Sequence, residues 1–144
     1  MKQKFVIEGL AGKKILNGEI KVNGAKNAIL PLLAASTLIN GPVEFSNVPK
    51  IEDVERMLEL LKNLGGEFEW TGKRTLKVDG NKISSQILDD DSAKRMRASI
   101  LLTGPLLARF GKVTFPHPGG CVIGERPIDL FIEGFKKMGA TVSE

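Results

Sequence analysis

The residues best suited to chemistry gather in one short stretch, "HPGGCVIGERPIDL", at positions 117–130. Cys121, the only cysteine of the chain, follows a glycine pair and precedes Arg126 by five residues. Positive charge near a thiol lowers its pKa and favours the reactive thiolate. The stretch therefore predicts a reactive cysteine, and the alternative is a buried loop cysteine that packs as a small hydrophobic group.

A predicted helix start directly follows this thiol. Pro127 suits the first position of a helix, and Gly139 suits its C-terminal stop. The free amides of residues 128–130 would then point back toward the cysteine, next to Arg126. An arginine beside a helix N-terminus predicts a phosphate site. An exposed arginine paired with a neighbouring carboxylate is the alternative.

A second set of polar side chains lies at the starts of two apolar stretches. An internal repeat aligns Asn27 with Arg97, and Lys26 and Arg95 flank these two positions. Two positively charged helix starts can converge on one anion, which adds to the predicted anion site. Solvated helix ends are the alternative here.

Other kinds of site fit the sequence poorly. His117 is the only histidine, and nothing nearby offers the orienting partner that a cysteine–histidine nucleophile needs. One cysteine and one histidine do not make a zinc site, and the glycines around Cys121 do not match nucleotide-binding spacings. The sequence therefore predicts neither a metal nor a cofactor.

Composition limits the class of protein. The chain has 144 residues, 42% hydrophobic and 26% charged, which suits one soluble globular domain. Its net charge of +4 is scattered among 17 acidic residues, and there is no tyrosine, so nucleic acid is not the expected partner. No apolar run approaches the ~20 residues of a membrane span, so no membrane partner is expected. A lone cysteine makes no internal disulfide, and a cytoplasmic location is expected.

The elements that must position these residues recur along the chain. The pattern G-x-V-x-F at 41–45 returns at 111–115, and "MLELLKNLGG" at 57–66 resembles "FIEGFKKMGA" at 131–140. The spacing between copies grows from 70 to 74 residues, so the second copy carries four extra residues around Cys121. Loops carry function more often than cores do, which favours a functional site in this insertion.

Hydrophobic periodicity predicts the individual elements. Pro31 is expected within the first turn of an apolar helix buried on nearly every face, where its missing N–H would lack a helical partner. The predicted elements are a strand at 15–22, that helix from about 27, a strand at 41–48, a helix at 51–65, a hairpin at 67–80, a helix from about 92, a second apolar helix at 96–110 and a helix at 127–139. The predicted core-facing positions are Ile51, Val54, Met57, Leu58, Leu61 and Leu64 in one helix and Ile128, Ile132, Phe135 and Met138 in another.

Four stretches carry a family resemblance: "VNGAKNAILPLLAASTL", "NVPKIEDV", "MRASILLTGPLLARFG" and "PGGCVIGERPIDL". They resemble the N-terminal part of the UDP-N-acetylglucosamine enolpyruvyl transferases, over nearly the whole chain. The related 5-enolpyruvylshikimate-3-phosphate synthases share the fold but lack the cysteine loop. The resemblance implies an α/β fold, an inside-out barrel of βαβαββ repeats that is incomplete in this chain.

The resemblance also implies a division of the chain. Residues 1–20 would belong with a C-terminal domain that this chain does not contain. Residues 21–144 would form a partial N-terminal domain, with a first repeat at about 21–80 and a truncated second repeat at about 81–144. The chain is thus interpreted as an N-terminal fragment that is inactive alone.

The reaction implied by the resemblance is transfer of the enolpyruvyl group of phosphoenolpyruvate to the 3′-hydroxyl of UDP-N-acetylglucosamine, with release of phosphate. It is the first committed step of peptidoglycan synthesis. The partners would be these two small molecules and the missing C-terminal part of the enzyme. A repeat domain that only binds or packs against a partner is the alternative.

Individual positions match the family's functional residues. Cys121 matches the general acid, which also forms an adduct with phosphoenolpyruvate and is the target of fosfomycin. Lys26 and Asn27 match a phosphoenolpyruvate-contacting pair, and Arg97 matches a UDP-sugar contact. The matches to the UDP-binding segment are Arg126, Pro127, Ile128, Asp129 and Leu130. Phe131 departs from relatives that carry a histidine there.

Overall fold

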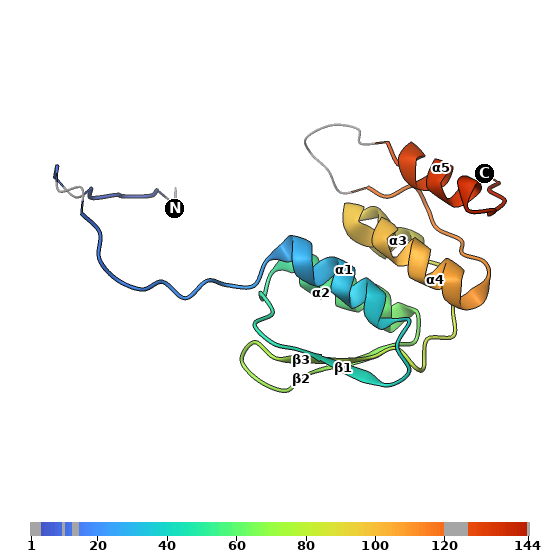
Figure 1. Cartoon of the computed structure of the whole chain (residues 1–144), viewed down its shortest axis with the longest axis horizontal. Coiled ribbons are helices and arrows are strands. Elements are labelled where there is room, and N and C mark those ends of the chain that lie inside the picture. Colours follow the sequence, from blue (N-terminus) through green and yellow to red (C-terminus); the bar gives the residue numbers. More distant parts are fainter. Residues whose placement is uncertain (1–3, 10, 13–14, 120–126, 144) are drawn as a thin grey trace.

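The computed structural model describes residues 4–9, 11–12, 15–119 and 127–143. Helices cover one side of a small sheet, and the N-terminal segment extends away from this body (Figure 1). In chain order the elements are α1 (Lys26–Ser36), β1 (Pro42–Phe45), α2 (Glu52–Asn63), β2 (Glu67–Trp70), β3 (Leu76–Asp79), α3 (Asp90–Lys94), the 3-10 helix η1 (Arg97–Leu102), α4 (Thr103–Phe110) and α5 (Asp129–Lys137).

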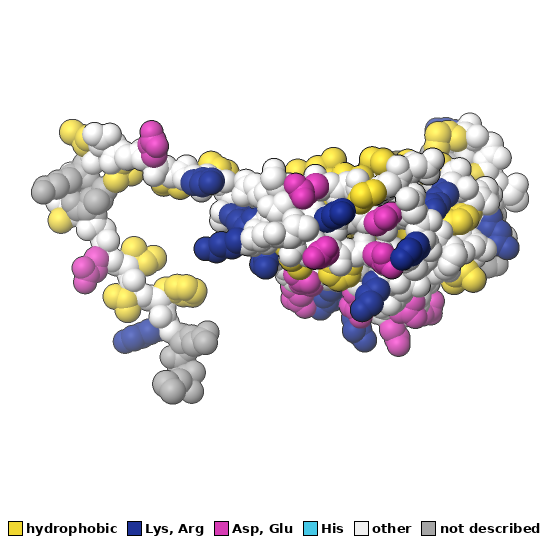
Figure 2. All heavy atoms as spheres, turned by 90° about the horizontal axis from the view of Figure 1, so that it is seen from below, with side chains coloured by type: hydrophobic (Ala, Val, Ile, Leu, Met, Phe, Trp, Pro, Cys, Tyr) yellow, Lys and Arg dark blue, Asp and Glu magenta, His cyan; other side chains and the backbone are white. Residues whose placement is uncertain are grey.

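The sheet has the strand order β1-β3-β2, and both pairings are antiparallel. Leu76 and Val78 of β3 are buried against the helices, whereas Lys77 between them is exposed. Acidic and basic side chains are interspersed over the face of the molecule seen from below (Figure 2). The predicted β2–β3 hairpin is confirmed, with the Thr71 amide donating to the Thr75 carbonyl at 3.1 Å.

Helix α2 confirms the predicted apolar face. Five of the six predicted positions, Val54, Met57, Leu58, Leu61 and Leu64, are at most 2% exposed. Ile51 immediately precedes the helix and packs against this core as a partly buried residue. Because this face is fully covered, α2 anchors the first repeat.

Helix α1 differs from its prediction in two ways. It begins at Lys26, so Pro31 lies inside the helix and removes the bond that residue 31 would donate to the Asn27 carbonyl. The prediction that Pro31 falls in the unbonded first turn was therefore wrong. The prediction of burial on nearly every face was also wrong, because Leu32 is 50% exposed and Pro31 and Ala35 are exposed as well.

The second apolar stretch forms two helices in place of one. Residues 97–102 adopt the 3-10 helix η1 and residues 103–110 continue as α4, which ends at Gly111 with a φ of 71°. The repeated G-x-V-x-F pattern makes only an isolated parallel bridge between Thr114 and Ile87. The repeat is thus visible in the helices, while its second strand is reduced to one bridge.

Helix α5 is the repeat partner of α2 but is far less buried. It begins at Asp129 after Ile128, so the prediction of Pro127 as the first helical residue was wrong by two positions. Ile128 is 7% exposed, whereas Met138, which matches buried Leu64, is 78% exposed, so its predicted core position was wrong. The described residues after α5 form no strand, so nothing there covers α5 as β2 and β3 cover α2.

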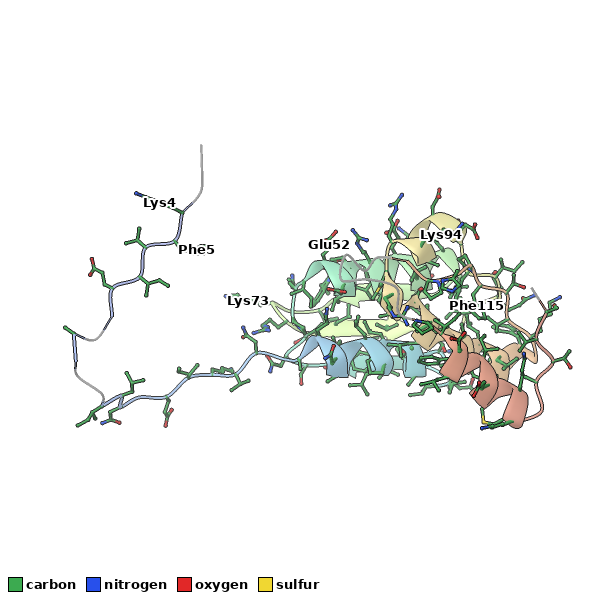
Figure 3. All side chains as sticks on the ribbon, turned by 90° about the horizontal axis from the view of Figure 1, so that it is seen from above. Lys4, Phe5, Glu52, Lys73, Lys94 and Phe115 are labelled. Carbon is green, nitrogen blue, oxygen red and sulfur yellow. The ribbon has the colours of Figure 1, made fainter. Side chains whose placement is uncertain are left out.

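The predicted strand at 15–22 is absent from the structure. These residues have no strand assignment, and Ile15, Leu16, Ile20 and Val22 are 78–91% exposed. Lys4 and Phe5 lie on the same segment, away from the folded body (Figure 3). Strand propensity alone does not form a strand without a neighbouring strand to pair with. Nowhere in the described part of the chain is there a helix long and apolar enough to cross a bilayer.

The two repeats are joined through Arg109. Helices α1 and η1–α4 run side by side (Figure 1), and Arg109 near the end of α4 reaches the end of α1. Its guanidinium donates to the carbonyls of Thr37 (2.7 Å), Gly80 (2.8 Å), Asn81 (3.1 Å) and Ile83 (3.3 Å). One side chain thereby fixes the end of α1 and the segment that follows β3.

Acid should weaken α3 through its N-cap. The Asp89 carboxylate accepts from the Ser92 amide at 2.9 Å, and this hydrogen bond holds the Asp89 pKa below its usual 3.8. The cap therefore stabilises the folded state above the unfolded pKa, and its contribution is lost as the pH falls through the lower folded pKa. We expect the free energy of unfolding to fall less steeply below about pH 4 in Asp89→Asn, since asparagine caps without ionising.

Urea unfolding at several acidic pH values measures this difference. Asp91→Asn is the matched control, because it removes a carboxylate from the same first turn but not the cap bond to Ser92. Equal pH dependence in the Asp89→Asn and Asp91→Asn variants would contradict the assignment.

Candidate functional site

The start of α1 is an electropositive position. Lys26 is the first residue of the helix, its N-cap Ala25 provides no side-chain hydrogen bond, and the first turn contains no acidic residue. A lysine there adds to the positive end of the helix dipole, which is unfavourable for the helix and favourable for a bound anion. Asn27 follows and is exposed. The anion contact expected of these two residues stays a prediction.

Lys26 has one carboxylate neighbour on α2. The Lys26 ammonium lies 3.5 Å from the Asp53 carboxylate, and the two side chains are 49% and 42% exposed. An ion pair this exposed contributes little to stability. It nevertheless ties the start of α1 to the start of α2. Nothing in the sequence indicates this pair.

A close backbone approach sets the path into α1. A Cβ atom on Gly24 would lie 2.0 Å from the Asn47 carbonyl oxygen, so only glycine fits there. Asn47 has a φ of 54°, and its side-chain amide donates to the Val22 carbonyl at 3.3 Å. The segment leading to Lys26 is therefore seated on the turn after β1.

The structure brings Arg97 to the start of the α5 region. The Arg97 guanidinium donates to the Pro127 carbonyl at 3.0 Å, joining two predicted site residues from distant parts of the sequence. Ile128 is buried, while Asp129 and Leu130 are exposed. This contact was not predicted, because nothing in the sequence reveals which acceptor an arginine will find.

At the start of α5, two backbone amides come before the first residue that donates a helical hydrogen bond. The first helical donors are the amides of Phe131 and Ile132, both to the Ile128 carbonyl at 2.9 and 3.2 Å. The amides of residues 129 and 130 precede them, as expected for a helix N-terminus. Among the described residues these two amides have no hydrogen-bond acceptor, and the predicted phosphate site stays a prediction.

Two central predictions lie outside the described residues. Cys121 and Arg126 fall within 120–126, so their proposed roles stay predictions. Gly119 is the last described residue before this segment. A Cβ on Gly119 would lie 2.1 Å from the Lys94 carbonyl oxygen. The backbone therefore enters the cysteine segment in close contact with the end of α3.

Within the described residues, the α1 half of the predicted site makes no polar contact with Arg97. Among the described side chains, no hydrogen bond or ion pair joins Lys26 or Asn27 to Arg97. The described ranges also contain no group of three or more His, Cys, Asp or Glu residues placed to hold a metal ion. An open groove of about 610 Å³ lies elsewhere, lined by charged residues such as Glu67, Glu69 and Lys77 of the sheet.

Comparison with known proteins shows which family the chain belongs to. The sequence profile of EPSP synthase (3-phosphoshikimate 1-carboxyvinyltransferase) matches residues 10–144. The chain belongs to the EPSP synthase family. The solved structure of the enolpyruvyl transferase NikO from Streptomyces tendae has a TM-score of 0.59 and 26% identity, covering 67% of this chain and 22% of that one. The EPSP synthase family fold predicted from the sequence is thus confirmed, in its incomplete form.

Curated members of the EPSP synthase family are more similar in sequence. The UDP-N-acetylglucosamine 1-carboxyvinyltransferase of Campylobacter hominis is 48% identical over 127 residues, 88% of this chain and 30% of the relative. The enzyme of the same name from Aliivibrio fischeri is 48% identical over 139 residues, covering 96% of this chain and 32% of the relative. The chain therefore spans about a third of these relatives. The predicted resemblance is confirmed.

Proposed function

We propose that this chain is the part of a UDP-N-acetylglucosamine enolpyruvyl transferase that binds phosphoenolpyruvate and the UDP-sugar. The complete enzyme transfers the enolpyruvyl group to the sugar 3′-hydroxyl and releases phosphate. The sugar oxygen adds to C2 of phosphoenolpyruvate while C3 gains a proton, and the resulting tetrahedral intermediate loses phosphate. Cys121 supplies the proton as general acid, a role that needs a mobile, protonatable group close to C3.

The observation that carries this proposal is the contact between Arg97 and Pro127. In this contact a cation lies beside the start of α5, where the amides of residues 129 and 130 precede the first bond to the Ile128 carbonyl, and such an arrangement suits a diphosphate. Lys26 at the uncapped start of α1 suits the anionic phosphoenolpyruvate. The names of relatives 48% identical to this chain support the same reaction.

The proposal includes a role for the N-terminal segment. Residues 1–20 pack with the C-terminal part of the longer enzyme, while residues 21–80 and 81–144 form two successive repeats. The supporting observation is that six apolar side chains of residues 1–20 are at least 75% exposed. They are Phe5, Val6, Ile7, Ile15, Leu16 and Ile20.

A chimera tests the proposed function. Residues 1–144 would replace the corresponding third of the Aliivibrio fischeri relative, and phosphate release from phosphoenolpyruvate would be measured with and without UDP-N-acetylglucosamine. We expect sugar-dependent phosphate release by the chimera and none by the 144-residue chain alone. A folded chimera without turnover would favour a repeat domain that only binds or packs against a partner, and turnover by the chain alone would contradict its predicted inactivity.

Arg126→Ala in the same chimera should weaken UDP-sugar binding. Loss of a charge-assisted contact to the diphosphate is expected to cost about 1.5 to 3 kcal/mol of binding free energy. Calorimetric titration with UDP-N-acetylglucosamine measures the change. Lys112→Ala, which removes an exposed cation that is not among the predicted site residues, is the control, and equal affinities in the two variants would refute the diphosphate contact.

A further inference from the structure

Both described ends of the cysteine segment rest on one short stretch, residues 94–97. On one side, Gly119 lies so close to the Lys94 carbonyl oxygen that a Cβ would approach it to 2.1 Å. On the other side, Arg97 donates to the Pro127 carbonyl at 3.0 Å. Residues 94–97 therefore contact both ends, residue 119 through the Lys94 backbone and residue 127 through the Arg97 side chain.

This stretch needs support from outside itself. It connects α3, a helix of only five residues, to η1, and helices this short are not stable on their own. Met96 is 3% exposed and anchors the stretch in the core through its side chain. Its backbone is held by Arg56 of α2, whose guanidinium donates to the Arg95 carbonyl at 2.5 Å.

Arg56 is itself fixed before it makes this contact. Its Nε and Nη2 atoms lie 3.1 and 2.5 Å from one carboxylate oxygen of Glu52, one turn earlier on α2. The guanidinium is planar, so two bonds to Glu52 orient its Nη1 group toward the Arg95 carbonyl. The Arg56 side chain is 34% exposed and the Glu52 side chain 77%. An exposed pair of this kind adds little stability, so its main effect is on geometry.

We propose that Arg56 is a positioning residue for UDP-sugar binding, which it serves by holding the 94–97 stretch that places Arg97 and the start of the α5 region. This inference rests on the proposed function. Arg56 touches no substrate in this scheme. It acts through the Arg95 carbonyl, and then through Arg97 and Pro127. Lys26 and Asn27 lie on α1 and do not depend on this contact.

The test uses the chimera described above with three variants. Arg56→Met keeps the aliphatic stem but removes the donors, Arg56→Lys restores one donor, and Lys62→Met removes a cation from the other end of α2 as the matched control. We expect Arg56→Met to raise KM for UDP-N-acetylglucosamine about tenfold and to leave KM for phosphoenolpyruvate within about twofold. Arg56→Lys should recover part of the loss, and Lys62→Met should resemble the unchanged chimera.

Different failures have different meanings. If the unchanged chimera shows no turnover, the proposed function is wrong and this inference falls with it. If it turns over but Arg56→Met and Lys62→Met share the same KM for the sugar, only the inference is overturned. Equal increases in both KM values would also overturn it, because a general loosening of α2 would act on both substrates.

Discussion

Replacing Cys121 with serine in the chimera should lower the turnover rate by about 100-fold to 10,000-fold, the usual effect of a general acid. A serine hydroxyl is close in size to a thiol but far less acidic, so it is a poor proton donor near neutral pH. The fold should be unaffected, and thermal unfolding curves check this. Phosphate release at saturating substrate concentrations measures the loss.

Cys121→Asp separates acid chemistry from thiol chemistry. A carboxyl group whose pKa is raised in a closed site can donate the proton, so this variant should recover part of the activity. It should also resist fosfomycin, since no thiol remains for the drug to alkylate. Wild-type activity in the serine variant would show that Cys121 is not the acid. Fosfomycin inactivation of an active aspartate variant would show that Cys121 is not the alkylated group.

The second large effect is expected at Arg109. Arg109→Met keeps the stem of the side chain but leaves four backbone carbonyls without their charged donor. We expect a loss of about 2 to 4 kcal/mol in the free energy of unfolding, since each charge-assisted bond contributes a sizeable fraction of this. Urea unfolding of the 144-residue chain measures it.

Arg109→Lys and Lys112→Met complete the series. Lysine is a point charge without the planar fork, so Arg109→Lys should keep roughly half of the stabilisation. Lys112 is exposed, and its replacement should change stability by less than about 0.5 kcal/mol. If Arg109→Met were no more destabilising than Lys112→Met, the four contacts would not join the repeats as described.

The sequence predicted elements well where one signal dominates. The apolar face of α2 repeats at helical spacing, and the hairpin has turn residues between two alternating strands, so both were predicted with nearly correct bounds. The predictions at Pro31 and Pro127 failed because a helix boundary depends on capping geometry, which shifts by one or two residues without changing the pattern.

The burial of individual side chains was harder to predict, because it depends on which other elements pack against them. Leu64 and Met138 occupy matching positions in the two repeats, yet their exposures are 2% and 78%. For the candidate site, residue types indicated Lys26 and Arg97, but Asp53 and Arg56 escaped notice. Their roles come from contacts between elements, and a helical pattern records only which face of its own helix a residue occupies.

The apolar face of α2 is buried, whereas that of α5 is much less buried, and this difference affects how often each helix unfolds locally. Local opening costs little where few apolar contacts must break, so amide hydrogens in α5 should exchange with deuterated solvent well before those in α2. The earliest exchange would include residues at the start of α5, next to the carbonyl that Arg97 holds. A ligand seated there would pay part of its binding free energy to close this helix, and would in turn slow the exchange of its amides.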